Sequence, residues 1–207
     1  MRIFLGVTGA SGAAYAGRAL RALTRAGCRV GLCASDAGCQ VIGHEILELA
    51  ELPGPVRRDE VLARFLDLYA DGADVDVLDP GDFSSRYASG SSGARAALVA
   101  PCSMATLAVI AHGTGTNLIH RAAEVMLKER RRLVLVPRET PLSLVQIENM
   151  AAVTRAGGIV LPAMPGLYTR PRTVEDMIDF VVARALDHLG VANDLVPRWG
   201  QTGEVVA

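Results

Sequence analysis

Three stretches of the 207-residue sequence combine glycine turns, hydroxyl groups and positive charge in ways that suit anion binding. The first is GVTGASGAAY, in which Gly9, Ser11 and Gly12 follow a short apolar run. A glycine turn that opens a helix gathers backbone N–H groups at the positive end of the helix dipole, which suits phosphate and other anions. The spacing differs from the dinucleotide fingerprint, because Gly9 and Gly12 are three residues apart and Gly6 precedes the turn. A purely structural turn, with Ser11 as a helix cap, is the alternative.

The other two stretches add hydroxyl groups and cations. In YASGSSG, residues 87–93, three serines surround Gly90 just before a predicted strand, although a solvent-exposed loop has the same composition. In residues 101–142, a predicted helix carries Arg121 and Lys128, which are seven residues apart and share one helical face. Two cations on one face suit a phosphate, and an exposed amphipathic face is the alternative. Lys128 is the only lysine among 21 basic residues, which indicates either chance or a site that needs a compact ammonium group.

These stretches lie at the ends of predicted strands. Apolar runs separated by helical patterns and by glycine or proline turns predict alternating strands and helices, which is typical of a parallel sheet covered by helices. The expected strands are 2–7, 29–34, 75–78, 96–100, 132–136 and 159–162, and the expected helices are 13–26, 36–51, 61–69, 103–112, 118–130 and 174–189. Ser35 and Asp36 should start the second helix, and the polar segment 79–93 should be an ordered loop beside a site. Such sheets bind ligands beyond the carboxyl ends of their strands, where the motifs fall.

Composition excludes several classes of protein. Half of the residues are hydrophobic and 21% are charged, which excludes a disordered chain. The 21 basic and 22 acidic residues leave no basic surplus for nucleic-acid binding. The four cysteines show no metal-ligand spacing, and no apolar run approaches the roughly 18 residues of a membrane span. We therefore expect a soluble, cytoplasmic protein with reduced thiols and no metal.

Several motifs resemble those of the UbiX-type flavin prenyltransferases. They are GASGA, ASGS, PCSMATLA, NLIHRAAEVMLKERRRLVLVPRETPL, ENM, PAMPGLY and VVARALDHLG, and the resemblance covers the chain from Ile3 to Trp199. It implies an α/β, Rossmann-like and flavodoxin-related three-layer fold with a mostly parallel sheet, formed by one domain over residues 1–192. It also implies a homo-oligomer, a dodecamer built from trimers. The tail at 193–207 would pack on a neighbouring subunit, with anchoring in its own core as the alternative for Trp199.

The activity that the resemblance implies is a metal-independent prenyl transfer. The dimethylallyl group of dimethylallyl monophosphate would be joined to reduced FMN, which yields prenylated FMN for a UbiD-type decarboxylase. Breaking the allylic C–O bond leaves a phosphate with growing negative charge, so the site needs cations and neutral hydrogen-bond donors around that phosphate.

The resemblance also assigns the site residues by position. FMN is expected to contact Gly9, Ala10, Ser11, Ser35, Cys102, Ser103, Met104, Ala105 and Arg138. The prenyl phosphate is expected to contact Ser89, Arg121, Lys128, Tyr168 and Arg184. The expected catalytic residues are Glu139, Ser11, Glu45 and Lys128. Several of these residues should meet only across a subunit interface.

Two assigned residues have competing interpretations. Glu139 can serve as a proton carrier, whereas an ion pair with Arg138 or a cap before Thr140 and Pro141 would make it structural. Cys102 is expected to contact the flavin through its backbone and not to act as a nucleophile, because no base is paired with it in the sequence.

Two positions depart from the family pattern, and two other functions compete. Phe83 stands where relatives often have a larger aromatic residue, and Gln146 stands where many have histidine, so the sequence leaves the shape of the prenyl pocket undetermined.

A flavin-dependent cysteine decarboxylase of the related homo-oligomeric flavoproteins would share the fold, but it needs a catalytic His and an Asn-rich motif that are not found here. A non-catalytic flavin carrier, or an accessory subunit of a decarboxylase, would need the FMN contacts but no prenyl-phosphate pocket.

Overall fold

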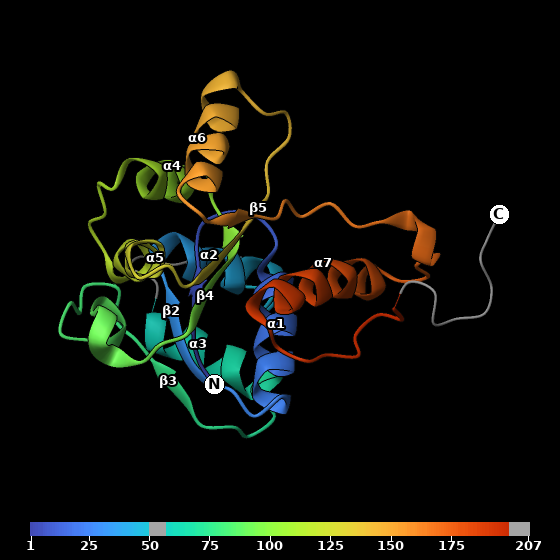
Figure 1. Ribbon diagram of the computed structural model, residues 1–207. Coiled ribbons are helices and arrows are strands. Elements are labelled where there is room, and N and C mark those ends of the chain that lie inside the picture. The colour runs from blue at the N-terminus through green and yellow to red at the C-terminus, as the bar shows by residue number, and fades with distance from the viewer. Residues whose placement is uncertain (50–56, 199–207) are drawn as a thin grey trace.

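The centre of the structure is a six-stranded sheet in which every strand pair is parallel. The computed structural model describes residues 1–49 and 57–198, and Figure 1 shows the sheet with helices on both sides. The order across the sheet is β3-β2-β1-β4-β5-β6, which is the order of the doubly wound Rossmann fold. The predicted Rossmann-like, three-layer fold is therefore confirmed. The strands are β1 (Arg2–Val7), β2 (Arg29–Ala34), β3 (Val75–Val77), β4 (Ala96–Cys102), β5 (Arg132–Pro137) and β6 (Ile159–Val160).

Seven helices of the described residues cover the two faces of the sheet. Successive residues of a strand point to opposite faces, so Leu5 of β1 packs with Leu20 and Leu186 on one face, while Phe4 packs with Leu107 and Ile119 on the other. The first layer contains α1 (Ala13–Arg25), α2 (Asp36–Glu45), α3 (Arg58–Tyr69) and α7 (Val174–Leu189). The second layer contains α4 (Met104–His112), α5 (Leu118–Lys128) and α6 (Leu144–Arg155).

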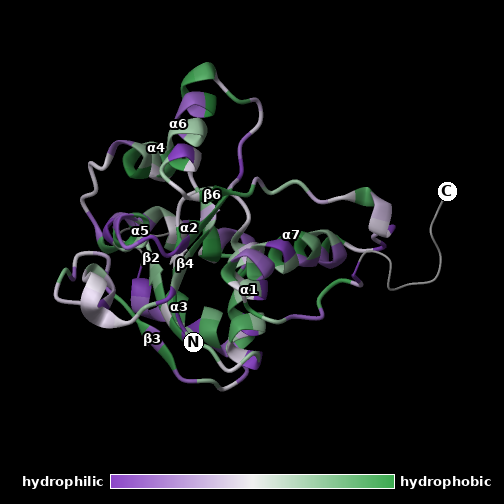
Figure 2. Ribbon diagram, in the orientation of Figure 1, coloured by the Kyte–Doolittle hydropathy of each residue, from purple (hydrophilic) through white to green (hydrophobic). Residues whose placement is uncertain are grey.

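The central strands are buried on both faces, which explains their continuous apolar runs. All residues of β4 are buried, and so is every residue of β1 and β2 after the arginine that begins each strand. Each large aliphatic side chain that is buried in this way stabilises the fold by about 1.5–3 kcal/mol. Figure 2 shows hydrophobic strands inside helices of mixed polarity. In the described part of the chain, no helix has the length and apolar character of a membrane span.

The second helix ends earlier than the sequence predicted. α2 ends at Glu45, so the expectation of helix to about residue 51 is wrong for residues 46–49, and residues 50 and 51 lie outside the described part. Glu48 has a φ of 51°, and the Leu47 N–H donates to the Ile42 carbonyl oxygen at 3.2 Å, as is typical of a helix terminus. This ending turns Leu47 into the core, a tertiary contact that helix propensity does not include.

Helix α6 was not predicted from the sequence, although it begins with a capping box. The Gln146 N–H donates to Ser143 Oγ at 3.3 Å, and the Ser143 N–H donates to Gln146 Oε1 at 2.8 Å. Leu144, Val145 and Ile147 are exposed, so the apolar residues do not mark one buried stripe. Gln146, one of the two departures from the family pattern, thus caps this helix. The start of α6 is the hydrophobic tip at the top of Figure 2.

Candidate active site

The turn after β1 approaches α2 closely and leads directly into α1. A Cβ atom on Gly9 would lie 2.5 Å from the Cβ of Ala37, so a larger residue does not fit there. Gly12, the N-cap of α1, has a φ of 123°, which favours glycine. Within the described residues, the N–H groups of Gly9 and Ser11 have no hydrogen-bond partner. The turn therefore offers backbone donors at the carboxyl edge of the sheet.

A carboxylate from α2 caps the start of α1. Glu45 Oε2 accepts hydrogen bonds from the N–H groups of Gly12 and Ala13, each at 2.8 Å. Gly12 has no side chain to cap the helix, so Glu45 satisfies these otherwise free donors and places negative charge at the positive end of the helix. Glu45 thus lies beside the predicted Ser11, and it occupies two of the N–H groups that an anion could otherwise bind.

Thr8 ties this turn to the loop after β4, although the sequence motifs did not single it out. Its side chain is 2% exposed, and its hydroxyl donates to the Pro101 carbonyl oxygen at 2.9 Å. The Thr8 hydroxyl oxygen in turn accepts from the Ser103 N–H at 2.7 Å. Because β1 and β4 are neighbours only in the sheet, no local pattern could reveal this pair of residues. The two predicted flavin-binding loops are joined here.

Two predicted FMN contacts are N-caps at the same edge. Ser35 Oγ accepts from the Gly38 N–H at 3.0 Å, and Ser103 Oγ accepts from the Thr106 N–H at 3.2 Å. The starts of α2 and α4 therefore lie with the start of α1 at the carboxyl ends of the strands. The positive ends of three helix dipoles converge on this edge, which suits an anionic ligand.

The turn from β4 into α4 contains a chemically inert thiol. Cys102 is fully buried, and burial raises the pKa of its thiol, so it stays protonated. This supports the expectation that Cys102 offers its backbone and not a nucleophile. The next two predicted contacts form the first turn of α4, where Met104 is largely buried and Ala105 is exposed.

Arg138 and Glu139 follow β5 at the same edge. Arg138 is exposed, and its Nε donates to the Ser11 carbonyl oxygen at 3.3 Å, so it reaches the turn after β1. Glu139 Oε1 accepts from the Thr140 N–H at 3.0 Å. Among the described residues, Glu139 forms no ion pair with Arg138, which argues against that interpretation. Two predicted FMN contacts and one predicted catalytic carboxylate are thus brought together.

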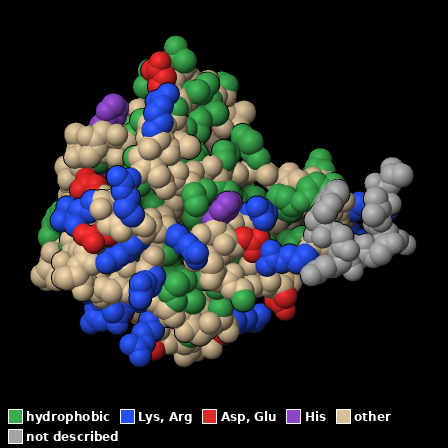
Figure 3. All heavy atoms as spheres, viewed as in Figure 1, with side chains coloured by type: hydrophobic (Ala, Val, Ile, Leu, Met, Phe, Trp, Pro, Cys, Tyr) green, Lys and Arg blue, Asp and Glu red, His purple; other side chains and the backbone are tan. Residues whose placement is uncertain are grey.

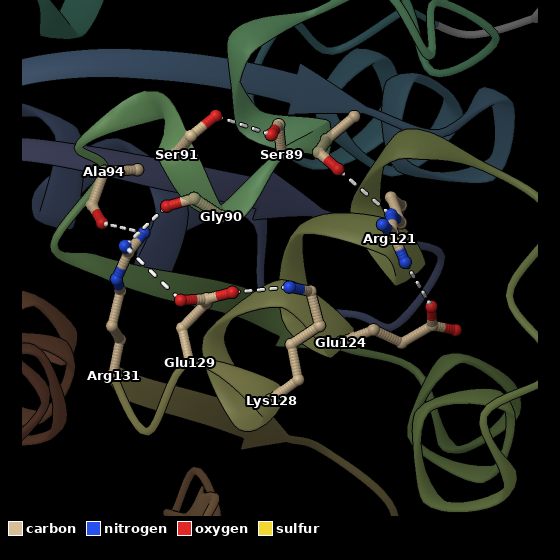
Figure 4. A network of polar contacts seen from close by, with 10 residues as sticks. Ser89, Gly90, Ser91, Ala94, Arg121, Glu124, Lys128, Glu129 and Arg131 are labelled. Carbon is tan, nitrogen blue, oxygen red and sulfur yellow. Dashed lines mark hydrogen bonds and ion pairs between the residues drawn. The ribbon is translucent and has the colours of Figure 1, made fainter.

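A second group of predicted residues lies along α5, and Figure 4 shows it from close by. The serine loop, residues 87–93, runs beside this helix, and arginines hold alternate carbonyl oxygens of the segment 88–94. The bonds are Arg121 Nε to Ala88 at 3.0 Å, Arg131 Nη2 to Gly90 at 2.5 Å, Arg2 Nη1 to Ser92 at 3.2 Å, and Arg131 Nη1 to Ala94 at 2.9 Å. The hydroxyls of Ser89 and Ser91 lie 3.0 Å apart on the exposed side. Arg2, Arg121 and Arg131 together form an arginine clamp that fixes the loop carrying Ser89.

Glu129 connects Lys128 to this clamp. The Lys128 Nζ lies 2.5 Å from Glu129 Oε1, and this ammonium group lowers the pKa of the Glu129 carboxyl. The other carboxylate oxygen lies 3.9 Å from Arg131 Nη2. A Cβ on Gly90 would lie 2.2 Å from Glu129 Oε1, so the loop backbone packs directly on the carboxylate. Sequence reasoning missed both Glu129 and Arg131, because the loop that they hold, at Gly90 and Ala94, lies about 40 residues away in the chain.

Lys128 and Arg138 lie at opposite edges of the sheet. Lys128 ends α5 just before β5 begins, whereas Arg138 directly follows β5. The six residues of β5 span roughly 17–20 Å at about 3.3 Å per residue. One chain therefore does not bring the predicted phosphate-binding lysine to the predicted flavin edge.

Tyr168 and Arg184 belong to the other helix layer. The Tyr168 ring packs edge-on against Phe180 of α7, with ring centroids 5.7 Å apart. Arg184 Nη1 lies 2.9 Å from Asp187 Oδ2 in the same helix. Because α7 and α5 cover opposite faces of the sheet, the predicted prenyl-phosphate residues form separate groups within one chain. In the described part, no group of three His, Cys, Asp or Glu residues could hold a metal ion.

Comparisons with known proteins agree with this geometry. The model of the Flavoprotein family matches residues 1–186. A flavin prenyltransferase UbiX from Methanothermobacter thermautotrophicus is 48% identical over 197 residues, which are 95% of this chain and 94% of that protein. The structure of AnUbiX (PadA1) in complex with FMN and dimethylallyl pyrophosphate is similar with a TM-score of 0.82 and 39% identity, over 96% of each chain. A dodecameric FMN-dependent UbiX-like decarboxylase from Escherichia coli O157:H7 matches with a TM-score of 0.82 and 38% identity, over 96% of this chain and 99% of the other. The chain thus belongs to the UbiX flavin prenyltransferases within the Flavoprotein family.

Proposed function

We propose that this protein joins the dimethylallyl group of dimethylallyl monophosphate to reduced FMN and so makes prenylated FMN. The observation that carries the proposal is the carboxyl edge of the sheet, where Arg138 reaches the Ser11 turn beside the starts of three helices. Membership of the UbiX family supports it. The cysteine-decarboxylase and carrier alternatives have no comparable support.

FMN fits the carboxyl edge as an anionic ligand. The free N–H groups of Gly9 and Ser11, the Ser35 hydroxyl and the Arg138 guanidinium are donors that suit a phosphate and a polar ring. We assign FMN contacts to Gly9, Ala10, Ser11, Ser35, Cys102, Ser103, Met104, Ala105 and Arg138. When bound in reduced form, FMN would supply the electron-rich N5 and C6 atoms that take the prenyl group.

The departing phosphate needs positive charge and neutral donors. Arg121, Lys128 and Arg184 would bind its growing charge, and Ser89 and Tyr168 would donate hydrogen bonds. The serine loop suits this role, because the arginine clamp holds its carbonyl oxygens and leaves the Ser89 hydroxyl exposed. A fixed donor stabilises the transition state without the cost of ordering it first.

Proton transfer is assigned to Glu139. Ring closure through N5 and C6 displaces a hydrogen from each atom, so a carboxylate that takes up and returns protons suits the reaction. The Thr140 N–H binds one carboxylate oxygen of Glu139 and fixes the orientation of the group. Ser11 would donate or relay a hydrogen bond at the flavin edge, and Glu45 would hold the Ser11 turn in place through Gly12.

The complete site would form between subunits of a homo-oligomer. Within one chain, Lys128 and Arg138 lie at opposite ends of β5. A neighbouring chain would therefore supply its phosphate-binding residues to the end of the sheet where FMN is assigned. Exposed apolar side chains suit such contacts: Leu144, Val145, Ile147, Met164 and Leu167. We propose a dodecamer, in which residues 1–192 form one domain and the tail from 193 packs on a neighbour. Trp199, which the sequence placed in that contact, lies outside the described residues.

We further propose a place for the product and a cellular location. Prenylated FMN would be delivered to a UbiD-type decarboxylase, and the protein would work in the cytoplasm.

Phe83 is 52% exposed, so it is available to line a prenyl pocket that a neighbouring subunit completes.

The decisive experiment is anaerobic incubation with reduced FMN and either dimethylallyl monophosphate or diphosphate, followed by mass spectrometry of the flavin. Prenyl transfer adds a five-carbon unit to the flavin mass. Comparing the yields with dimethylallyl monophosphate and with the diphosphate shows which of the two the protein uses. A carrier would bind FMN without a new mass. A cysteine decarboxylase would instead release carbon dioxide from a substrate that contains cysteine.

A further inference from the structure

A row of arginines crosses the amino edge of the sheet, opposite the flavin edge. β1 and β2 begin with Arg2 and Arg29, which are register partners, and β5 begins with Arg132. Arg95 directly precedes β4, and its N–H donates to the Arg2 carbonyl oxygen at 3.0 Å. Parallel strands start at the same edge, so arginines from distant parts of the sequence become neighbours. In Figure 3, Lys and Arg side chains gather at the lower left, around the place where Figure 1 shows the N-terminus.

A cavity opens within this row. Its volume is about 520 Å³, and it is lined by Met1, Arg95, Arg130, Arg131, Arg132 and Leu189. Four of these six residues are arginines. The cavity shares no residue with the FMN set or the prenyl-phosphate set assigned above.

Two of the four guanidinium groups are held in place mainly by backbone carbonyl oxygens. Arg131 donates to the carbonyl oxygens of Gly90 and Ala94, and Arg132 Nη1 donates to the Leu189 carbonyl oxygen at 2.8 Å. A carbonyl oxygen orients a guanidinium group but carries no full charge to compensate it. Both cations are therefore positioned before any ligand arrives, which lowers the entropic cost of binding.

Little negative charge faces the cavity. In the described part of the chain, the one carboxylate within ion-pair distance of a lining arginine is Glu129, at 3.9 Å from Arg131. Glu129 is itself closely paired with Lys128. Arg95 and Arg130 are exposed and form no ion pair with a described residue. The cavity thus holds several positive charges with one distant counter-charge.

We propose that this cavity binds an oligophosphate anion, such as inorganic tripolyphosphate or the phosphate chain of a nucleoside triphosphate. Several guanidinium groups around one cavity match a ligand with several adjacent charges better than a single phosphate, because each phosphate group can take its own bidentate arginine. The exposed Met1 side chain gives the cavity an apolar wall, which a nucleoside could contact and inorganic tripolyphosphate would not use. Arg131 also holds the serine loop, so the test uses Arg95 and Arg130, which have no part in the assigned prenyl-transfer machinery.

The test is calorimetric titration of the FMN-saturated protein with tripolyphosphate at fixed ionic strength. Saturation with FMN keeps the flavin edge from contributing. Arg95→Gln and Arg130→Asn should each weaken binding about tenfold, and the double variant about a hundredfold, as expected when charge-assisted hydrogen bonds are lost. Asparagine is chosen at position 130 because Arg130 has a φ of 54°, a conformation that asparagine tolerates. The matched control is Arg155→Asn, which removes an exposed arginine at the end of α6.

Three results would overturn the proposal: no binding of tripolyphosphate by the wild-type protein, equal affinity for orthophosphate at the same ionic strength, or equal losses in Arg155→Asn. A parallel titration with ATP distinguishes the two sources of the phosphate chain. Equal affinities for ATP and tripolyphosphate indicate recognition of the chain alone, and tighter ATP binding indicates that the apolar wall contacts the nucleoside. Circular dichroism of each variant checks that the fold is kept.

Discussion

The Nε of Arg138 lies 3.3 Å from the carbonyl oxygen of Ser11, so the residue that follows β5 reaches the turn that follows β1. These strands are not neighbours, because β4 lies between them. The guanidinium group therefore spans the sheet edge at the point where the strand order reverses, which is where ligands of doubly wound folds bind. One donor is used on the turn, and the remaining N–H groups of Arg138 form no hydrogen bond with a described residue, so they are available to a ligand.

Replacing Arg138 with alanine should weaken FMN binding. The variant loses a charged donor at the flavin edge, so the dissociation constant should rise at least tenfold, which corresponds to about 1.5–3 kcal/mol. Fluorescence titration of FMN measures this, with Arg155→Ala as the control for removal of an exposed arginine. Unchanged affinity in Arg138→Ala would remove Arg138 from the flavin site.

Glu45→Ala should destabilise the start of α1. The N–H groups of Gly12 and Ala13 would lose their acceptor, at a cost of about 1 kcal/mol, as for other helix caps. Thermal unfolding should show a lower midpoint, and FMN affinity should fall because the Ser11 turn loosens. Glu148→Ala, an exposed glutamate of α6, is the control. If Glu45→Ala kept full stability but lost prenyl transfer, Glu45 would act on the reactants and not on the turn.

Lys128→Arg should impair prenyl transfer although the charge is kept, because a planar fork on a longer side chain misplaces the departing phosphate. Lys128→Ala should cost more, roughly 10- to 100-fold in rate, as expected for a lost hydrogen bond to a charged group. Single-turnover formation of prenylated FMN under anaerobic conditions measures both. FMN affinity should stay at the wild-type value. A wild-type rate in Lys128→Ala would make the lone lysine a chance feature of composition.

Arg131→Lys should loosen the serine loop. One ammonium group cannot replace the two guanidinium nitrogens that hold Gly90 and Ala94, so Ser89 would lose its fixed position. The KM for the prenyl phosphate should rise several-fold, while FMN affinity stays unchanged. The neighbouring Arg130→Lys is the matched control, since Arg130 makes no contact with this loop among the described hydrogen bonds. Equal KM values for the two variants would show that the clamp does not position Ser89.

The sequence was informative where local pattern and tertiary structure agree. β1 and β2 have the predicted bounds, because continuous apolar runs bounded by glycine turns are buried on both faces. α7 also has its predicted bounds, since Thr173 and Asp176 cap it at one end and Gly190 ends it in the left-handed conformation. The capping box of α6 was equally readable, but its exposed apolar residues hid the helical period.

The site was less predictable, because its contacts join distant parts of the chain. The cap of α1 comes from Glu45, and Thr8 binds a carbonyl oxygen 93 residues away. The partner of such a residue is set by the sheet order, which local spacing does not contain. Resemblance to a family supplied residue positions, yet it did not indicate Glu129 or Arg131, which connect Lys128 to the serine loop.

The separation of Lys128 and Arg138 by the length of β5 has a genetic consequence. If each site takes its lysine from one chain and its arginine from another, then two different inactive chains can rescue each other. Co-expression of Lys128→Ala and Arg138→Ala chains should restore about one quarter of wild-type activity, because random assembly into a closed symmetric oligomer joins two intact halves in about one site in four. A pair of defective alleles would thus complement in the same cell. A chain that carries both substitutions would give no activity with either single variant, because every site would then lack the lysine or the arginine.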